Sequence, residues 1–456
     1  METIDIIKSQ NDFFNSNQTK DIGFRIKQLK KIKFLLKDNE KLLFKAIYKD
    51  FGKSKFETYV SEFALIYHEI NTAVKNLKKW SQFKKVGTSL VNFPAKSYII
   101  PEPLGTILVI GAWNYPYQLS LLPAISAIAA GNTVVLKPSE LPLHTSNVMA
   151  TLINNAFNSN YFYVKEGGIS VATALLELRF DKIFFTGSSA VGRKIYLAAA
   201  KHLTPVTLEL GGKSPTFVFS DTDIKTTAKR IAWAKFLNAG QTCVAPDYIL
   251  VEQKAEERFI HALKEELNKY PKKHQDFSDN YTQIINTANF DRLKDLIDNS
   301  TICYGGSTDR NTRFISPTIL KNVSFNDKIM EDEIFGPILP IIIFTDIDLA
   351  IQEIKKRPKP LACYIYSKNK ETIKKILHEI SFGGGAINES IMQLSNSNLP
   401  FGGVGFSGMG SYHAKAGFDT FSHYKSILHK PFWFESSLKY APYSNKKMNW
   451  IKRLME

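Results

Sequence analysis

Short apolar runs separated by helical stretches recur along most of this chain from Thr106 onward, and this pattern constrains its fold more than any other feature. Examples are TILVI, TVVLK, KIFFT, YILVE and ILPIIIF. Such runs alternate with helices when parallel strands are covered on both faces. We therefore predict an α/β fold with doubly wound parallel sheets. Residues 1–80 differ, because Leu, Ile and Phe recur three and four positions apart with Lys between them, which predicts amphipathic helices packed on a sheet.

The chain has 456 residues, more than the roughly 250–300 that one core usually serves, so we expect more than one domain. Two strand-like runs in residues 81–101 predict a hairpin that interrupts the α/β series. Alternating aromatic and polar residues in 418–431 predict a strand that pairs with this hairpin, in the same subunit or a neighbour. Residues 432–456 mix aromatics with Lys and Arg without a sustained amphipathic period. We expect this tail to dock on the body or be loosely ordered, and weak attachment to a membrane surface is the alternative.

The formal net charge of +16 raises the question of a nucleic-acid partner. Only ten of the 59 basic residues are Arg, and the lysines are scattered, which favours a solvated surface and no nucleic acid. Three cysteines without a CxxC pair predict neither a disulfide framework nor a metal site. The start of the chain lacks an export signal, and Pro123 breaks the longest apolar stretch, so we expect a cytoplasmic protein without a transmembrane segment.

Three segments contain side chains suited to carbonyl chemistry. Cys243 lies in NAGQTCVAP, where small residues indicate a tight loop before a strand, and its thiol is a candidate nucleophile or a small core residue. Glu209 in LELGG ends an apolar run, so burial should raise its pKa and make it a base; a capping or ion-paired Glu is the alternative. Asn114 in GAWNYP follows a strand and could donate to an oxyanion or form a turn.

Three further segments are candidates for binding a dinucleotide. In FFTGSSAVG a strand leads through Gly187 and Ser188 to a helix that contains Gly192, which would leave the backbone open for a pyrophosphate. This is neither GxGxxG nor a P-loop. Lys137 and Glu140 in VVLKPSE stand where a strand ends and could hold ribose hydroxyls. In EIFGP, Glu333 and Phe335 could grip a ribose or simply form a turn.

Together, GAWNYP, VVLKPSE, FTGSSAVG, LELGGKSP, GQTCVAP and EIFGP resemble the aldehyde dehydrogenase superfamily in order and separation, and the short amino-terminal region resembles its class 3 branch, which includes fatty and aromatic aldehyde dehydrogenases. The resemblance implies NAD(P)-dependent oxidation of medium- or long-chain aliphatic or aromatic aldehydes to acids. It implies that Cys243 forms a thiohemiacetal and then a thioester, that Asn114 stabilises the oxyanion, and that Glu209 activates the hydrolytic water. A CoA-acylating aldehyde dehydrogenase and a non-catalytic basic binding protein for nucleic acid or membrane surfaces are the alternatives.

The resemblance also implies which segments serve the cofactor and the assembly. Residues 1–80 and 102–209 correspond to the NAD(P)-binding domain, 210–417 to the catalytic domain, and 81–101 with 418–431 to the oligomerisation strands of a homodimer, followed by the tail 432–456. Cofactor contacts are expected at Lys137, Glu140, Gly187, Ser188, Gly192, Glu333 and Phe335, with Glu140 favouring NAD and NADP also possible. Substrate-lining candidates are Trp113, Tyr115, Ile391, Phe401 and His413.

Overall fold

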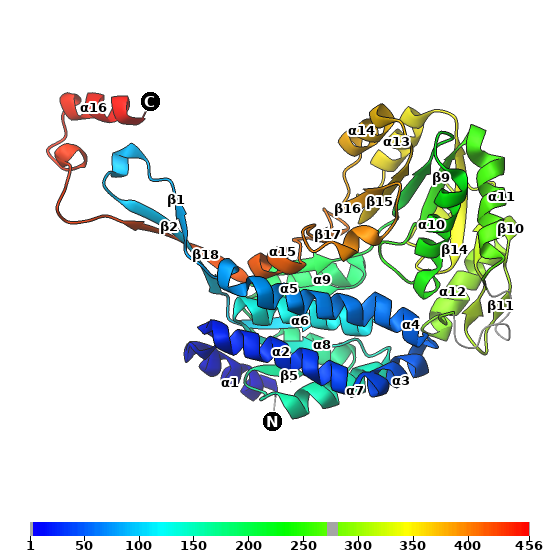
Figure 1. The fold of residues 1–456 in the computed structure, drawn as a ribbon, viewed down its shortest axis with the longest axis horizontal. Coiled ribbons are helices and arrows are strands. Elements are labelled where there is room, and N and C mark those ends of the chain that lie inside the picture. Colours follow the sequence, from blue (N-terminus) through cyan, green and yellow to red (C-terminus); the bar gives the residue numbers. More distant parts are fainter. Residues whose placement is uncertain (1–2, 271–280, 456) are drawn as a thin grey trace.

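A computed structural model describes residues 3–270 and 281–455 and shows two α/β units with an extended arm (Figure 1). The first unit is built on a six-stranded sheet in the order β17-β7-β6-β3-β4-β5, in which β17 alone is antiparallel. Its strands are β3 (Thr106–Ile110), β4 (Thr133–Lys137), β5 (Phe162–Val164), β6 (Lys182–Thr186), β7 (Val206–Glu209) and β17 (Gly408–Met409). The doubly wound α/β prediction is confirmed.

Alternate residues of β3 show why this sheet is covered on both faces. Ile107 and Val109 belong to a core with the amino-terminal helices, whereas Leu108 and Ile110 belong to a second core on the other face. The connecting helices are α6 (Pro116–Ala130), α7 (Leu143–Ala156), α8 (Ile169–Leu176) and α9 (Ser189–Ala200).

The amino-terminal region is helical, as predicted. It consists of α1 (Thr3–Asn15), α2 (Ile22–Asp38), α3 (Glu40–Phe51), α4 (Lys55–Thr58) and α5 (Ala64–Trp80), and a π-helical turn, η2 (Tyr59–Phe63), joins α4 to α5. Helices α2 and α5 lie against α6, and α3 lies against α7, so this layer covers one face of the six-stranded sheet.

The second unit is built on a seven-stranded sheet in the order β10-β13-β14-β9-β8-β15-β16, with β10 antiparallel to β13. Its strands are β8 (Pro215–Val218), β9 (Tyr248–Glu252), β10 (Ile302–Tyr304), β13 (Thr318–Leu320), β14 (Ile338–Phe344), β15 (Ala362–Tyr366) and β16 (Gly384–Ile387). Its helices are α10 (Ile224–Phe236), α11 (Glu256–Leu267), α12 (Thr287–Asp298), α13 (Ile347–Lys355) and α14 (Lys370–Glu379), and a small ribbon pairs β11 (Thr308–Asp309) with β12 (Phe314–Ile315).

An antiparallel sheet of β1 (Lys84–Val86), β2 (Lys96–Pro103) and β18 (Ser422–His429) forms the arm that leaves the body in Figure 1. Strand β18 follows α15 (Ala414–Thr420) and pairs with β2 along its whole length, from Ser422 opposite Pro103 to His429 opposite Lys96. The hairpin is as predicted, and of the two alternatives left open for the partner strand the structure shows pairing within the same subunit.

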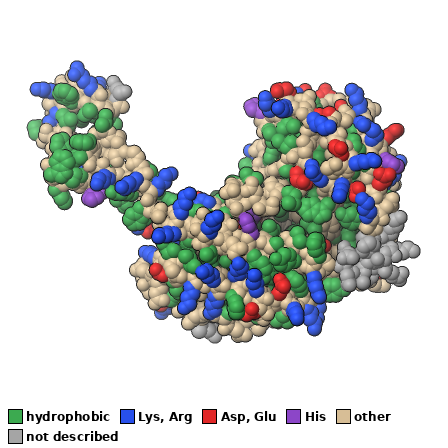
Figure 2. All heavy atoms as spheres, in the orientation of Figure 1, with side chains coloured by type: hydrophobic (Ala, Val, Ile, Leu, Met, Phe, Trp, Pro, Cys, Tyr) green, Lys and Arg blue, Asp and Glu red, His purple; other side chains and the backbone are tan. Residues whose placement is uncertain are grey.

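The tail neither docks on the body nor lacks regular structure, in contrast to the two alternatives expected from its sequence. It runs to the tip of the arm and ends in helix α16 (Asn445–Met455), which contacts the turn η3 (Leu90–Asn92) (Figure 1). The helix is amphipathic, and apolar side chains gather with basic ones at the tip (Figure 2). The period was missed because Lys447 interrupts the apolar face. Within residues 3–270 and 281–455, no helix is both long and apolar enough to cross a bilayer.

Candidate active site

The carboxyl ends of four parallel strands of the first sheet carry most of the predicted site residues. Asn114 follows β3, Lys137 ends β4, Gly187 follows β6 and Glu209 ends β7. Open parallel sheets bind ligands at this edge because the loops that leave it diverge and expose main-chain groups. The register pairs Thr186 with Glu209, which places the last residues of β6 and β7 side by side.

The loop that carries Asn114 is joined to the loop that carries Cys243. The side-chain amide of Asn114 donates to the carbonyl oxygen of Gln241 at 3.0 Å, and the hydroxyl oxygens of Tyr115 and Thr242 lie 2.6 Å apart. Asn114 is buried. Its amide has two N–H groups, so one holds the loop and the second is available to a ligand oxygen. The structure thus brings together the predicted oxyanion donor and the segment directly before the predicted nucleophile.

The loop before Cys243 adopts an unusual backbone conformation. Asn238, Ala239 and Gly240 have φ values of 54°, 51° and 71°, which non-glycine residues seldom adopt. A Cβ atom on Gly240 would lie 2.3 Å from the carbonyl oxygen of Gly336, so the close approach also requires glycine there. Strained backbone of this kind is retained where the surrounding structure holds it and is concentrated at functional sites.

Cys243 is partly buried and has two acidic neighbours. Burial raises the pKa of its thiol to about 12, with further increases from the charges of Glu333 and Glu209, while the main-chain N–H groups of Cys243 and Val244 act in the opposite direction. The thiol is therefore protonated at neutral pH in this state. Addition to a carbonyl requires a group that removes this proton, and both nearby carboxyl groups carry raised pKa values.

Glu209 is buried at the end of β7, as its apolar surroundings predicted, and 2% of it is exposed. Neither carboxyl oxygen has a hydrogen-bond partner in the described part of the chain. Burial raises its pKa well above the usual value for Glu. A buried carboxyl with unpaired oxygens beside a thiol is suited to bind and deprotonate a water molecule.

Glu333 reaches the same region from the second unit. A Cβ on Gly211 would lie 1.8 Å from Oε2 of Glu333, so the absence of a side chain at Gly211 makes room for the carboxyl group. Burial and the charge of Asp247 raise the pKa of Glu333 to about 8, against the effects of the Gly212 N–H and Lys213.

The segment that carries Glu333 is tied to the start of β8 by a buried ion pair. Lys213 Nζ lies 2.6 Å from Asp247 Oδ2 and also donates to the carbonyl oxygens of Ile329 and Asp332, at 2.9 and 2.8 Å. These contacts fix the segment before Glu333 relative to the second sheet.

The predicted cofactor residues fit a dinucleotide on the chemistry of their donors. Lys137 Nζ pairs with Glu140 Oε2 at 2.8 Å. Burial raises the pKa of Glu140, but the hydrogen bond from Lys137, a main-chain hydrogen bond and the charge of Lys137 together outweigh burial and leave that pKa lowered. This charged carboxylate suits ribose hydroxyls. Ser188 caps α9 by accepting from Val191 N, so the positive end of that helix follows Gly187 directly. Gly192 lies in the second turn, where a Cβ would meet Leu210 at 2.6 Å.

The substrate-lining candidates fall into two aromatic groups and two residues with other contacts. Trp113 packs edge-on against Phe335, with ring centroids 5.2 Å apart, and Phe401 stacks on His413 at 5.4 Å. Burial lowers the pKa of His413 to about 4, so this imidazole stays neutral. Tyr115 is bound to Thr242, as described above. Ile391 is buried in the core that Cys243 borders and has a φ of 56°.

Sequence reasoning missed several residues around the thiol. The Tyr412 ring packs on His413 at 4.4 Å, and burial raises its pKa well above the usual value for Tyr, with further increases from the charges of Glu209 and Cys243. The hydroxyl of Tyr364 donates to the carbonyl oxygen of Val244 at 2.7 Å. Tyr412 directly precedes a predicted residue, which was the available signal, whereas Tyr364 lies within an apolar run that only predicts a strand. Lys53, Glu57 and Glu62 had no signal, because Lys and Glu side chains are usually solvated.

Comparison with known proteins gives consistent matches over nearly the whole chain. The sequence model of the aldehyde dehydrogenase family matches residues 2–427. The 4,4'-diaponeurosporen-aldehyde dehydrogenase of Staphylococcus aureus (strain NCTC 8325 / PS 47) is 47% identical, with 95% of each chain covered. The dimeric NADP-preferring aldehyde dehydrogenase of Rattus norvegicus is 44% identical, covering 95% of this chain and 96% of that one. A solved structure of the substrate-bound state of Staphylococcus aureus AldH matches with a TM-score of 0.97 at 46% identity, over 100% of both chains.

Proposed function

The chain belongs to the aldehyde dehydrogenase family and oxidises aldehydes with NAD or NADP, and on this premise we propose that it does so through a covalent intermediate on Cys243. In this proposal the product is the free carboxylic acid. The observation that carries it is the convergence of three groups from separate segments: the Cys243 thiol, the Asn114 amide held to the loop before it, and the unpaired Glu209 carboxyl.

The first step is addition of the thiol to the aldehyde. The thiol proton passes to water and from there to solvent, while sulfur forms a bond to the carbonyl carbon. The carbonyl electron pair moves to oxygen, where the free N–H of Asn114 and the main-chain N–H of Cys243 stabilise the negative charge. NAD(P) held by the cofactor residues would supply the acceptor for the hydride that leaves this carbon. Loss of hydride becomes favourable only after addition, because the oxyanion then supplies the electron pair that re-forms the carbonyl.

The second step is hydrolysis of the thioester that remains on Cys243. Glu209 takes a proton from water, the water oxygen bonds to the acyl carbon, and the thiolate leaves as the acid is released. The raised pKa of Glu209 matches this task, since a carboxylate buried in apolar surroundings is a stronger base than a solvated one. A CoA-acylating reaction would not need this base, so its presence favours hydrolysis.

We assign the cofactor to the six-stranded unit and the nucleophile to the seven-stranded unit. Lys137 and Glu140 would hold the adenine-side ribose, the start of α9 would hold the pyrophosphate, and Glu333 with Phe335 would hold the nicotinamide-side ribose. We expect NAD to be preferred, because a charged Glu140 repels a 2′-phosphate. The aromatic pairs Trp113–Phe335 and Phe401–His413 favour medium- or long-chain aliphatic and aromatic aldehydes.

One assay tests this proposal against its alternatives. NADH formation is followed with hexanal, decanal or benzaldehyde, with and without CoA, for the unaltered protein and for Cys243→Ser. Turnover without CoA that is lost in Cys243→Ser is expected, and Cys303→Ser, the same change at another partly buried thiol, should remain active. Turnover that requires CoA would favour the acylating enzyme. Salt-sensitive RNA binding without NADH formation would favour the non-catalytic binding protein.

We further propose a homodimer assembled through the arm. Strand β18 is the outer strand of the arm sheet and β16 is the outer strand of the seven-stranded sheet. Outer strands present unpaired main-chain N–H and C=O groups, which favour pairing with another chain. The two edges lie far apart within one chain in Figure 1, so an arm edge can reach such an edge only in a second copy.

The tip of the arm supports weak attachment to an anionic membrane surface. Helix α16 exposes Met448, Trp450, Leu454 and Met455, beside exposed Phe432 and Trp433. Its other face carries Lys446, Lys452 and Arg453, which suit anionic headgroups. The protein should sediment together with phosphatidylglycerol vesicles at low salt. The variant with Trp450→Ser and Leu454→Ser should stay in the supernatant. Equal sedimentation with neutral vesicles would contradict a role for the charges.

A cytoplasmic location remains part of the proposal. Cys243, Cys303 and Cys363 are all free, and a nucleophilic thiol needs a reducing compartment to stay so.

A further inference from the structure

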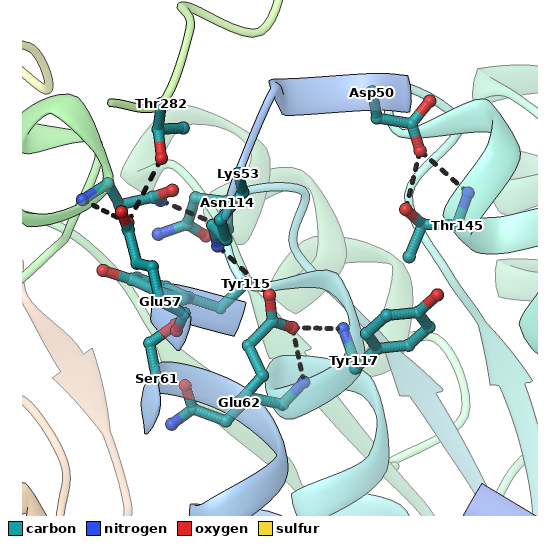
Figure 3. Close-up of polar contacts among 12 residues, drawn as sticks. Asp50, Lys53, Glu57, Ser61, Glu62, Asn114, Tyr115, Tyr117, Thr145 and Thr282 are labelled. Carbon is teal, nitrogen blue, oxygen red and sulfur yellow. Dashed lines mark hydrogen bonds and ion pairs between the residues drawn. The ribbon is translucent and has the colours of Figure 1, made fainter. Parts of the chain in front are cut away.

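Three charged side chains that the proposed chemistry does not use lie near Asn114 (Figure 3). Lys53 stands between α3 and α4, Glu57 lies in α4, and Glu62 lies in the π-helical turn η2. The side chains of Lys53 and Glu62 are fully buried, and Glu57 is partly buried. Charged groups rarely occupy such positions unless they are paired and hydrogen-bonded, so each contact of this cluster deserves a physical explanation.

Glu62 connects Lys53 to the helix that follows the Asn114 loop. Its Oε1 lies 3.1 Å from Lys53 Nζ, and its Oε2 accepts from the main-chain N–H groups of Tyr117 and Gln118 at 2.8 and 3.2 Å. These N–H groups lie in the first turn of α6, where intrahelical acceptors are lacking and a negative charge is favoured. Glu62 therefore fixes where α6 begins, two residues after Asn114.

Lys53 contacts the Asn114 loop directly. Its Nζ donates to the carbonyl oxygen of Asn114 at 3.5 Å and lies 4.5 Å from the centre of the Tyr115 ring. Tyr115 in turn bonds to Thr242, the residue before Cys243. A single ammonium group thus supports the main chain of the predicted oxyanion donor and the ring that reaches the nucleophile loop.

Glu57 supports the nucleophile loop at its other end. It accepts from the Asn238 N–H at 2.7 Å and from the Thr282 hydroxyl at 3.2 Å. The side-chain amide of Asn238 then donates to the carbonyl oxygens of Asn114 and Gln241, at 2.9 and 3.1 Å. Asn238 begins the left-handed run described above, so Glu57 holds the backbone where its conformation is least favourable.

We propose that Lys53, Glu57 and Glu62 are positioning residues that hold the Asn114 loop and the loop before Cys243 in the geometry required for addition of the thiol to the aldehyde. This inference rests on the proposed function. Stability alone is a poor reason for such a cluster, because apolar residues of similar volume often replace a buried ion pair without loss of stability. Its contacts instead converge on the two loops whose relative position decides the reaction, where a displacement of about 1 Å can cost roughly 100-fold in rate.

The test removes both charges of the ion pair together. Lys53→Met alone would leave Glu62 buried without its partner, so the informative variant is Lys53→Met with Glu62→Gln, which keeps a side-chain oxygen for the N–H groups of α6. We expect an unchanged Kd for NAD and an aldehyde KM within about twofold, with kcat lowered tenfold or more. The control makes the same two changes at a solvent-accessible pair, Lys355→Met with Glu379→Gln, and should retain wild-type kcat.

A second measurement separates this inference from the function on which it rests. The rate at which iodoacetamide alkylates Cys243 is followed by mass spectrometry of its peptide as a function of pH, without aldehyde. We expect the double variant to show a displaced pH profile relative to both the unaltered protein and the control. If the double variant does not fold, Glu57→Gln replaces it in this measurement, since it keeps an acceptor for the Asn238 N–H. We expect the same displacement of the alkylation pH profile in Glu57→Gln. A folded variant with wild-type kcat and an unchanged alkylation profile would overturn the proposal, whereas absence of turnover in the unaltered protein would overturn only the proposed function.

Discussion

Asn114 donates its side-chain amide to the carbonyl oxygen of Gln241 at 3.0 Å, and this bond spans the two α/β units. It joins the loop after β3 to the loop that presents Cys243. The amide therefore has a structural partner as well as its proposed oxyanion. The two N–H groups of one planar amide are fixed relative to each other, so the bond to Gln241 also orients the second N–H.

Replacing Asn114 should slow the reaction without weakening cofactor binding. Asn114→Ala removes one oxyanion donor, and kcat is expected to fall about 100- to 1,000-fold. Asn114→Asp keeps the shape but places an acceptor beside the developing negative charge, so its kcat should be no higher. Steady-state kinetics and NAD titration measure both effects. If Asn114→Asp retained most of the wild-type kcat, the oxyanion role would be wrong.

Glu209→Gln should separate acylation from hydrolysis. The amide cannot accept the proton of water, so a thioester is expected to accumulate after one rapid turnover and to be visible by intact-protein mass spectrometry. Because Glu209 acts as a base and burial raises its pKa, hydrolysis by the unaltered protein should accelerate as pH rises through that pKa. The variant should lack this limb of the pH profile. Steady-state rates that match the wild type would contradict the assignment.

Glu140→Gln should change the choice of cofactor. The lowered pKa of Glu140 keeps it charged at neutral pH, and this charge should repel a 2′-phosphate. Removing it is expected to improve kcat/KM for NADP relative to NAD by roughly tenfold, which corresponds to about 1.4 kcal/mol of removed repulsion. The control is Glu166→Gln, at an exposed Glu in the loop after β5. An unchanged ratio of the two cofactors would exclude Glu140 as the selective residue.

Glu69 should make stability depend on pH. It accepts from Ala414 N at 2.8 Å and Ser126 Oγ at 3.3 Å, and burial raises its pKa to about 7. The folded state therefore binds a proton more tightly than the unfolded state. Protonated Glu69 therefore adds up to roughly 3 kcal/mol to the free energy of unfolding. This contribution is fully present below about pH 4.5 and is lost as pH rises through about 7. The thermal midpoint of Glu69→Gln minus that of the wild type should therefore be larger at pH 8 than at pH 5. A difference that is independent of pH would show that the Glu69 proton does not contribute.

Ser426→Pro should disrupt the proposed dimer without unfolding the arm. Tyr424 faces Pro101 on β2, and proline has no N–H, so this pair is not hydrogen-bonded and the Tyr424 main chain points to the free edge. Ser426, two residues on, points the same way, so proline there removes an edge donor only. Sedimentation velocity should show a monomer, while Ser426→Ala remains dimeric. A dimeric Ser426→Pro protein would place the interface elsewhere.

Much of the fold could be predicted because its signals are local. The apolar runs that form β3, β4, β6 and β14 are buried on both faces, and this burial produces their continuous hydrophobicity. Strand β16 gave no such signal, because GGAI owes its pairing to the neighbouring strand β15 and not to its own side chains. The helical period of α16 was missed because Lys447 lies among its apolar residues.

The site was predictable only where it depends on motifs. Cys243, Glu209 and Asn114 lie next to glycine, proline and strand ends, which are visible in the sequence. Lys53 lies between α3 and α4 and Glu62 in the turn η2, where charged residues are ordinarily exposed, and only the tertiary packing of α6 against the helical layer buries them.

The third strand of the arm comes from the end of the chain and its first two from near the beginning. During synthesis the hairpin of residues 84–103 therefore emerges long before β18, its partner along Lys96–Pro103. A ribosome that stalls anywhere before residue 422 releases a protein whose arm cannot close and whose proposed contact edge does not exist. Assembly through this strand would thus restrict partnership to polypeptides whose translation had passed residue 429.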